Sequence, residues 1–95
     1  MSVYPHKTIV VMSPRWAAWL FWARSNGVSP AWRKSSHPYR WYKIGRPIHD
    51  LLNQHPNLNK IIILSIAGVS DGYHVLNIGQ FARENNIKLE EVYLK

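Results

Sequence analysis

The sequence contains no cysteine, which excludes a disulfide framework, a thiolate metal site and a cysteine nucleophile. It also has no apolar run that approaches the length of a membrane-spanning helix. The first residues, 1–7, lack the charged start and long apolar region of a secretory leader. We therefore expect a soluble cytoplasmic protein with no membrane partner, in the cytoplasm of the host cell if a phage encodes it.

Acidic residues are missing from the first half of the chain. Residues 1–49 contain eight Lys or Arg and no Asp or Glu, whereas residues 50–95 contain four and five. The first half therefore accounts for the net charge of +7. Such a charge favours a polyanionic partner, either nucleic acid or an acidic protein surface.

Recognisable catalytic and metal-binding patterns are absent as well. The five carboxylates form no paired acid/base motif. His49, His55 and His74 do not follow the spacing of a known metal site. We expect a protein that is not an enzyme and that holds no metal and no cofactor.

The length and composition predict one folded domain, residues 1–95. A chain of 95 residues forms a single hydrophobic core. An apolar content of 46% is that of a globular protein and not of a disordered one.

Two β-branched runs, Thr8–Met12 and Lys60–Ile66, are typical of strands buried on both faces of a sheet. Ser13 and Pro14 predict a helix that starts with a serine N-cap and a proline at its first position. Trp16, Trp19, Leu20 and Ala23 give this helix an apolar face, and Gly27 ends it. Trp22 lies off that face by helical spacing.

The rest of the chain continues the alternation. Residues 40–44 predict a short strand, residues 48–55 a short helix, residues 74–85 a longer helix, and residues 89–94 a last strand. The order is strand, helix, strand, helix, strand, helix, strand. It predicts a small Rossmann-like α/β domain with a mainly parallel sheet of three or four strands and helices packed on it.

Two loops fall where the strands of such a sheet end, which is where ligands bind in open α/β sheets. The first contains Ser13 and Arg15, and the second contains Gly68, Ser70, Asp71 and Gly72. Helix N-terminal amides, glycines and small polar side chains suit an anion or a nucleotide. We expect these loops to form a small anion crevice if the protein binds such a ligand.

The second loop also carries a family resemblance. The turn Gly68-Val69-Ser70-Asp71 and the helix end Ala82-Arg83-Glu84-Asn85-Asn86-Ile87 resemble the nucleotide-binding half of small Rossmann-like proteins of the SLOG and YspA-like type. The resemblance covers about a third of the chain and implies a nucleotide-binding turn. An ordinary strand-to-helix turn explains the same residues.

A different motif competes for the central stretch. Ala23-Arg24-Ser25-Asn26-Gly27-Val28-Ser29 has the spacing of a helix-turn-helix, with residues 30–35 as the start of a recognition helix. Arg33 and Lys34 would then face DNA. A helix that ends in a glycine C-cap explains the same residues, and we favour that interpretation.

The most distinctive feature is a stretch in which aromatic residues alternate with cations. Trp16 and Trp19 are expected in the core. The candidate contact residues are Trp22, Arg24, Trp32, Arg33, Lys34, Tyr39, Arg40, Trp41, Tyr42, Lys43 and Arg46. Aromatic side chains beside cations suit unpaired bases and phosphates, and they equally suit a protein interface.

Three functions follow from these patterns. The first is a small nucleic-acid-binding protein, for DNA or RNA, that uses residues 22–46. The alternative is a non-enzymatic interaction module, such as a phage or mobile-element inhibitor, that docks on an acidic face of a host protein. The third is a vestigial nucleotide or anion binder.

Overall fold

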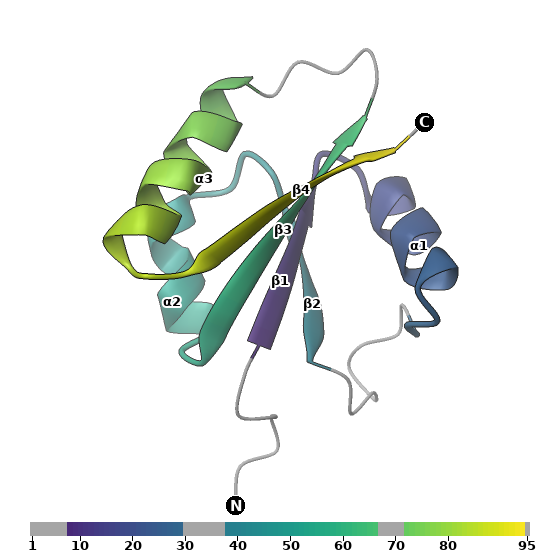
Figure 1. Cartoon of the computed structure of the whole chain (residues 1–95), viewed down its shortest axis with the longest axis horizontal. Coiled ribbons are helices and arrows are strands. Elements are labelled where there is room, and N and C mark those ends of the chain that lie inside the picture. Colours follow the sequence, from purple (N-terminus) through teal and green to yellow (C-terminus); the bar gives the residue numbers. More distant parts are fainter. Residues whose placement is uncertain (1–7, 30–37, 67–71, 95) are drawn as a thin grey trace, which may run out of the picture.

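The computed structural model describes residues 8–29, 38–66 and 72–94. Four strands, three α-helices and one 3-10 helix occupy these ranges (Figure 1). In chain order they are β1 (Thr8–Ser13), α1 (Trp16–Ser25), β2 (Tyr39–Lys43), the 3-10 helix η2 (Ile48–Asp50), α2 (Leu51–Gln54), β3 (Leu58–Ile66), α3 (Gly72–Glu84) and β4 (Lys88–Leu94).

The four strands form one parallel sheet in the order β2-β1-β3-β4. The predicted α/β layered class is therefore confirmed. The two β-branched runs occupy the two central positions, β1 and β3, where strands are covered on both faces. The weaker strand of residues 40–44 is present as β2, one residue earlier than predicted, at one edge of the sheet.

The helices cover the two faces of the sheet unequally. Figure 1 shows α1 on one face and α2 and α3 on the other. The chain moves outward from β1 to β2, returns across β1 to β3, and then moves outward again to β4. The direction of winding therefore changes between β1 and β3, which makes the carboxyl ends of these strands the topological switch point.

Alternation along the strands divides the core in two. On β1, Val10 and Met12 pack toward α2 and α3, whereas Val11 packs toward α1. The core on the α1 face is rich in aromatic side chains, and the core on the other face is mainly aliphatic.

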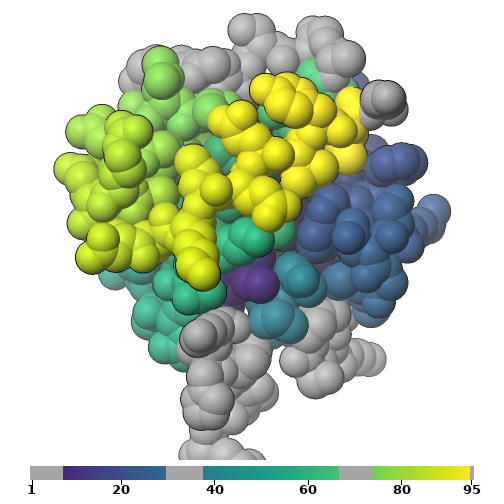
Figure 2. All heavy atoms as spheres, viewed as in Figure 1, coloured from purple at the N-terminus to yellow at the C-terminus, as the bar shows by residue number. Residues whose placement is uncertain are grey.

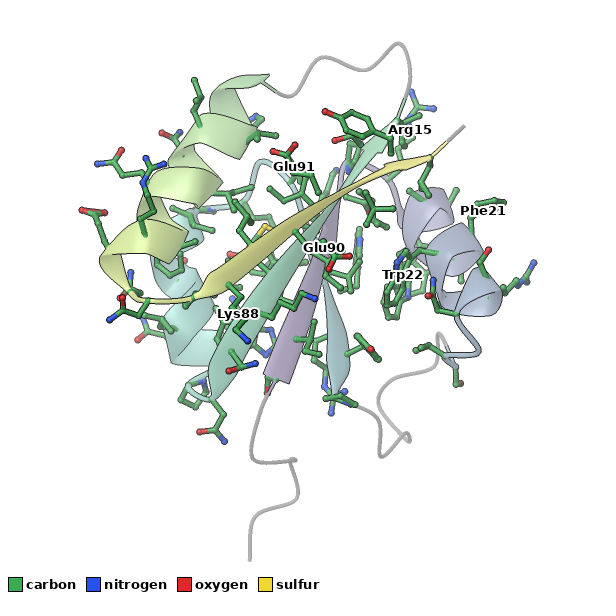
Figure 3. All side chains as sticks on the ribbon, in the orientation of Figure 1. Arg15, Phe21, Trp22, Lys88, Glu90 and Glu91 are labelled. Atoms are coloured by element: carbon green, nitrogen blue, oxygen red, sulfur yellow. The ribbon has the colours of Figure 1, made fainter. Side chains whose placement is uncertain are left out.

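Strand β4 forms the second edge of the sheet and carries charge. In Figure 2 it crosses the front of the molecule between α3 and α1. Lys88, Glu90 and Glu91 are exposed along it (Figure 3), and Lys60 Nζ on β3 lies 2.7 Å from Glu90 Oε1. Charged side chains on an edge strand disfavour pairing with another chain.

Both long helices end in the same way. The N–H groups of Val28 and Ile87 donate to the carbonyl oxygens of Ala23 and Ala82, each at 2.8 Å. The preceding residues, Gly27 and Asn86, have φ angles of 68° and 55°. This is the Schellman arrangement, in which a left-handed residue after the helix lets two backbone amides reach back to its last turn.

This ending explains the residues that resemble a helix-turn-helix. Asn26 Nδ2 donates to the carbonyl oxygen of Trp22, and Asn85 Nδ2 donates to that of Phe81, each at 2.8 Å. The favoured interpretation, a helix with a glycine C-cap, is confirmed at Gly27. The predicted recognition helix of residues 30–35 lies outside the described residues.

The start and the buried face of α1 differ from the prediction. Ser13 is the last residue of β1, and Arg15 is the N-cap with no side-chain capping bond. Trp22 is only 7% exposed and belongs to the core, whereas Trp16 is 42% exposed. The helix begins two residues later than Pro14, and the side that meets the sheet runs through residues 18, 19, 22 and 23. The placement of Trp22 off the buried face was therefore wrong.

Candidate functional site

Three exposed cations lie at or just after the carboxyl ends of β1 and β2. Ser13 and Lys43 are register partners at the ends of these strands, and the Ile44 N–H donates to the Ser13 carbonyl oxygen at 2.9 Å. Arg15 follows β1 directly, and Arg46 follows β2 in the next turn. The side chains of Arg15, Lys43 and Arg46 are exposed. We call Arg15, Trp16, Lys43 and Arg46 the basic edge.

Three of the predicted contact residues are not on the surface. Trp22 is 7%, Arg40 6% and Tyr42 2% exposed, which removes them from direct contact with a partner. Arg40 and Tyr42 alternate with Tyr39, Trp41 and Lys43 along β2, so they point toward the α2 and α3 face.

The other predicted contact residues divide into three groups. Arg24, Lys43 and Arg46 are exposed, and Tyr39 and Trp41 are half-buried against α1. Arg24 lies in the last turn of α1, at the opposite end of that helix from Arg15. Trp32, Arg33 and Lys34 lie outside the described residues.

The aromatic side chains near α1 form a continuous cluster. The rings of Trp19 and Trp22 stack at 6.0 Å, and the ring of Trp22 meets that of Tyr39 edge-on at 5.1 Å. At the other end, the ring of Trp16 meets that of Trp41 edge-on at 4.9 Å. Trp16 is the partly exposed member at the basic edge, and the packing against Trp41 holds its ring in place.

The Ser13 side chain is occupied by internal bonds. It is fully buried, its hydroxyl donates to the Arg15 carbonyl oxygen at 2.8 Å, and it accepts from Trp41 Nε1 at 2.7 Å. These bonds engage the Ser13 hydroxyl within the fold, and its predicted role in an anion crevice stays a prediction. Arg15 stays available, since its side chain is exposed at this end of the sheet (Figure 3).

A pocket of about 200 Å³ lies between the turn after β2 and the first two turns of α3. Among the described residues, its lining combines an apolar part with two cations and three further polar side chains, those of Tyr42, His74 and Asn77, and includes no carboxylate. The lining residues are Met12, Tyr42, Lys43, Ile44, Gly45, Arg46, Pro47, Ile48, His74, Asn77 and Ile78. The pocket therefore joins the basic edge to the aliphatic core beneath it.

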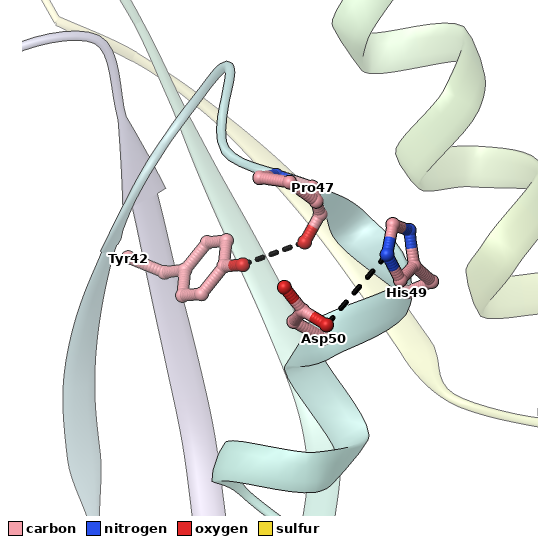
Figure 4. Close-up of polar contacts among 4 residues, drawn as sticks. All are labelled: Tyr42, Pro47, His49 and Asp50. Carbon is pink, nitrogen blue, oxygen red and sulfur yellow. Dashed lines mark hydrogen bonds and ion pairs between the residues drawn. The ribbon is translucent and has the colours of Figure 1, made fainter.

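Tyr42 holds the turn that forms one wall of this pocket. Its hydroxyl donates to the Pro47 carbonyl oxygen at 2.7 Å (Figure 4), and the Arg46 guanidinium lies 5.2 Å from the centre of its ring. Burial raises the pKa of Tyr42, the charge of Arg46 acts against this rise, and the charge of Asp50 adds to it. The hydroxyl therefore stays protonated and keeps its bond to the turn.

The carboxylate of Asp50 lies beside the imidazole of His49. Asp50 Oδ1 lies 3.6 Å from His49 Nε2, and both side chains are largely open to solvent (Figure 4). An exposed pair of this kind is weak, and the Asp50 carboxylate is not part of the pocket lining.

Two pocket residues were missed by the sequence analysis. His74 and Asn77 lie three residues apart at the start of α3, beside the apolar stripe that includes Ile78. A polar pair at helical spacing directly after a glycine-containing loop was the available signal. Of the second predicted loop, Gly68, Ser70 and Asp71 lie outside the described residues, and Gly72 is the first residue of α3.

Comparison with known proteins adds no assignment. No family model, curated protein or solved structure that was compared matches this chain. The likeness to SLOG and YspA-like proteins therefore stays a prediction. Within the described ranges no group of three or more histidine, aspartate or glutamate side chains is arranged to hold a metal ion. No helix in the same ranges has both the length and the apolar character needed to cross a membrane.

Proposed function

We propose that this protein binds nucleic acid along the basic edge. The observation that carries the proposal is the position of three exposed cations, Arg15, Lys43 and Arg46, at or just after the carboxyl ends of two neighbouring strands. Cations grouped in this way attract phosphates and release the counterions around them. A cytoplasmic location goes with this proposal, because nucleic acid is abundant there.

The exposed ring of Trp16 favours a strand with unpaired bases. Any of the bases can stack on an aromatic ring, so stacking gives little sequence preference. Neighbouring cations can hold the phosphates. Trp16 stands next to Arg15, and its contact with Trp41 reduces the freedom that it would lose on binding. We expect single-stranded DNA or RNA to bind more tightly than a duplex of the same length.

The test is fluorescence anisotropy with labelled single- and double-stranded oligonucleotides over a range of salt. The slope of log affinity against log salt changes by about 0.7–0.9 for each phosphate contacted. Replacing Arg15, Lys43 and Arg46 together by Gln should reduce the slope by about two to three. Trp16→Ala should weaken single-strand binding and leave the slope nearly unchanged.

The control variants each remove one cation away from the basic edge and are compared with the single substitutions at that edge. Arg83→Gln and Lys88→Gln each remove one exposed cation, from the last turn of α3 or from β4. They should leave the slope within a few tenths of the wild-type value. The absence of binding to every oligonucleotide at low salt would overturn the proposal, and an equal loss with the control variants would place the contact elsewhere.

The outward side of α1 supports a second candidate, contact with an acidic protein. Phe21 is 57% exposed and points away from the sheet (Figure 3), and Arg24 lies three residues further along the same helix. Aromatic and arginine side chains are enriched among the residues that dominate protein interfaces. A phage or mobile-element inhibitor of a host protein would use such a side.

This second candidate is tested by a pull-down from bacterial lysate treated with nuclease. A stoichiometric protein partner that survives the nuclease and is lost with Phe21→Ala supports it. Loss of the partner on nuclease treatment would indicate that this protein binds nucleic acid and not the partner directly. No partner in either sample counts against it.

A further inference from the structure

We propose that the pocket between the turn after β2 and α3 takes one unpaired nucleotide of the bound strand, with its base inside and its phosphate at Arg46. The inference rests on the proposed binding of nucleic acid and names what that site recognises. The pocket opens beside the basic edge, because Lys43 and Arg46 belong to both.

The size of the pocket limits what it can hold. Pockets that enclose whole drug-sized ligands measure about 300–1,000 Å³. A pocket of about 200 Å³ is too small for a dinucleotide cofactor and suits a single planar ring system. The rest of such a ligand must lie outside, where the basic edge continues.

The apolar part of the lining suits a base better than a phosphate. Met12 is 1%, Ile78 4% and Ile44 8% exposed, and they provide surfaces without hydrogen-bond donors. A phosphate placed among them would lose water without gaining partners, which is costly. The face of a base is apolar enough to be buried there, and a methionine adapts to aromatic rings.

The polar part of the lining suits the edge of a base and the phosphate attached to it. Asn77 is exposed at the rim, and its amide offers both a donor and an acceptor, as the edge of a base does. Arg46 supplies only donors and positive charge, which a phosphate requires. The opening of the pocket therefore offers both an amide that can pair with the edge of a base and a positive charge that can bind a phosphate.

The location in the fold agrees with this assignment. Met12 stands near the carboxyl end of β1, one of the two strands between which the winding changes direction. In open parallel sheets the crevice at this point is where nucleotides bind. The described walls come from β1, the turn after β2, and α3.

The first experiment detects the base directly. The sequence contains two methionines, Met1 and Met12, so labelling of methionine methyl groups with carbon-13 gives two NMR signals. A base stacked in the pocket should shift the Met12 signal upfield by its ring current. The ligands are the four nucleoside monophosphates at millimolar concentration, with inorganic phosphate as the comparison. Inorganic phosphate should not produce the shift.

The second experiment asks whether the pocket contributes to strand binding. Asn77→Ala should weaken the binding of the preferred homo-oligonucleotide about five- to tenfold and reduce the preference among the four bases, because the pairing to the base edge is lost. Gln80→Ala is the matched control, since Gln80 is exposed on the same helix and does not line the pocket. It should leave both quantities unchanged.

The outcomes separate this inference from the proposed function. If oligonucleotides bind but the Met12 signal does not move and Asn77→Ala behaves as Gln80→Ala, the pocket inference is overturned and nucleic-acid binding stands. If inorganic phosphate shifts Met12 as strongly as the nucleotides, the pocket takes an anion alone and the inference is overturned. If no oligonucleotide and no nucleotide binds, both proposals fail.

Discussion

The two faces of the sheet are packed by different means. One ten-residue helix, α1, covers its face with Trp19 and Trp22, and Tyr39 and Trp41 of β2 complete that core. On the other face two helices, α2 and α3, cover the sheet with aliphatic residues such as Leu51 and Ile78. An aromatic side chain buries about 150–250 Å², so a few of them let a single helix cover what otherwise needs two. Most of the aromatic side chains that the structure describes therefore serve the fold.

The proposed binding site lies at the edge where the two faces meet. Trp16 belongs to the aromatic face and Tyr42 to the aliphatic one, and both lie near the carboxyl ends of the strands. The exposed cations of the basic edge lie at or just after the same strand ends. The predicted contact surface of residues 22–46 is thus reduced, among the described residues, to this edge and to Arg24.

The largest effect is expected from removing the centre of the aromatic face. Trp19 is fully buried, and Trp19→Ala should lower the free energy of unfolding by about 3–5 kcal/mol. Leu51 is equally buried on the other face, and Leu51→Ala should lower the free energy of unfolding by about 2–5 kcal/mol. Urea unfolding followed by circular dichroism measures both. If Trp19→Ala costs less than Leu51→Ala, the aromatic core is not the main support of its face.

Trp19 also carries an unusual polar group. Its Nε1 is buried and has no hydrogen-bond partner in the described structure. Trp19→Phe removes this unsatisfied donor while it keeps a ring, so it should cost clearly less than Trp19→Ala. If both variants lower the free energy of unfolding equally, the shape of the indole, rather than the aromatic area, determines the packing.

The next effect concerns the two helix endings, one on each face. At Gly27 a Cβ atom would meet nothing within 4 Å, so the cost of a side chain comes from the backbone alone. Gly27→Ala should lower the free energy of unfolding by about 1–2 kcal/mol, because a φ of 68° is unfavourable for alanine. Gly27→Asn should cost less, since Asn86 already holds the same position after α3. Thermal unfolding checks the order of the variants, and an equal cost for Ala and Asn would contradict it.

The sequence predicted the fold well because the strands and helices carry strong local patterns. The β-branched runs at β1 and β3 and the apolar spacing of α3 each determine an element nearly alone. The start of α1 was predicted incorrectly because Ser13 fits an N-cap but pairs with β2 as the end of β1. Its hydroxyl then bonds to Arg15 and Trp41. The competition between sheet pairing and capping is decided by neighbouring strands, which local spacing does not reveal.

The candidate site was only partly predictable for a similar reason. The charge of the first half pointed to the cations, and Lys43 and Arg46 are at the surface as expected. Trp22, Arg40 and Tyr42 are buried because the register of β2 and the rotation of α1 place them against the sheet. The pocket also needs His74 and Asn77, which come from a helix about thirty residues further along the chain. Only the crossover from β3 to α3 brings these parts together.

A smaller effect is expected from the turn on the aliphatic side. Tyr42→Phe removes the bond to the Pro47 carbonyl oxygen and should lower the free energy of unfolding by about 0.5–1.5 kcal/mol. The raised pKa of Tyr42 adds a pH dependence: the stability is complete below the ordinary value of 10.0 and decreases as the pH rises through the higher folded value. Urea titrations near neutral pH and at pH values around 10 should show this alkaline loss in the wild type and a smaller one in Tyr42→Phe. An identical alkaline loss in both would assign it to other groups.

The smallest effect is an acid sensitivity on the aliphatic face. Burial lowers the pKa of His55, and the nearby charge of Arg40 lowers it further. The unfolded chain therefore takes up this proton at a higher pH than the folded protein. The stability that His55 contributes is complete above its ordinary value of 6.5 and is lost as the pH falls through the lower folded value. His55→Gln should flatten the decline in urea midpoint between pH 7.5 and pH 5, whereas His49→Gln, which changes an exposed residue, should not. If the urea midpoints of both variants decline as that of the wild type does, the acid sensitivity arises elsewhere. The charge of Arg40 near His55 then gives this face no pH dependence.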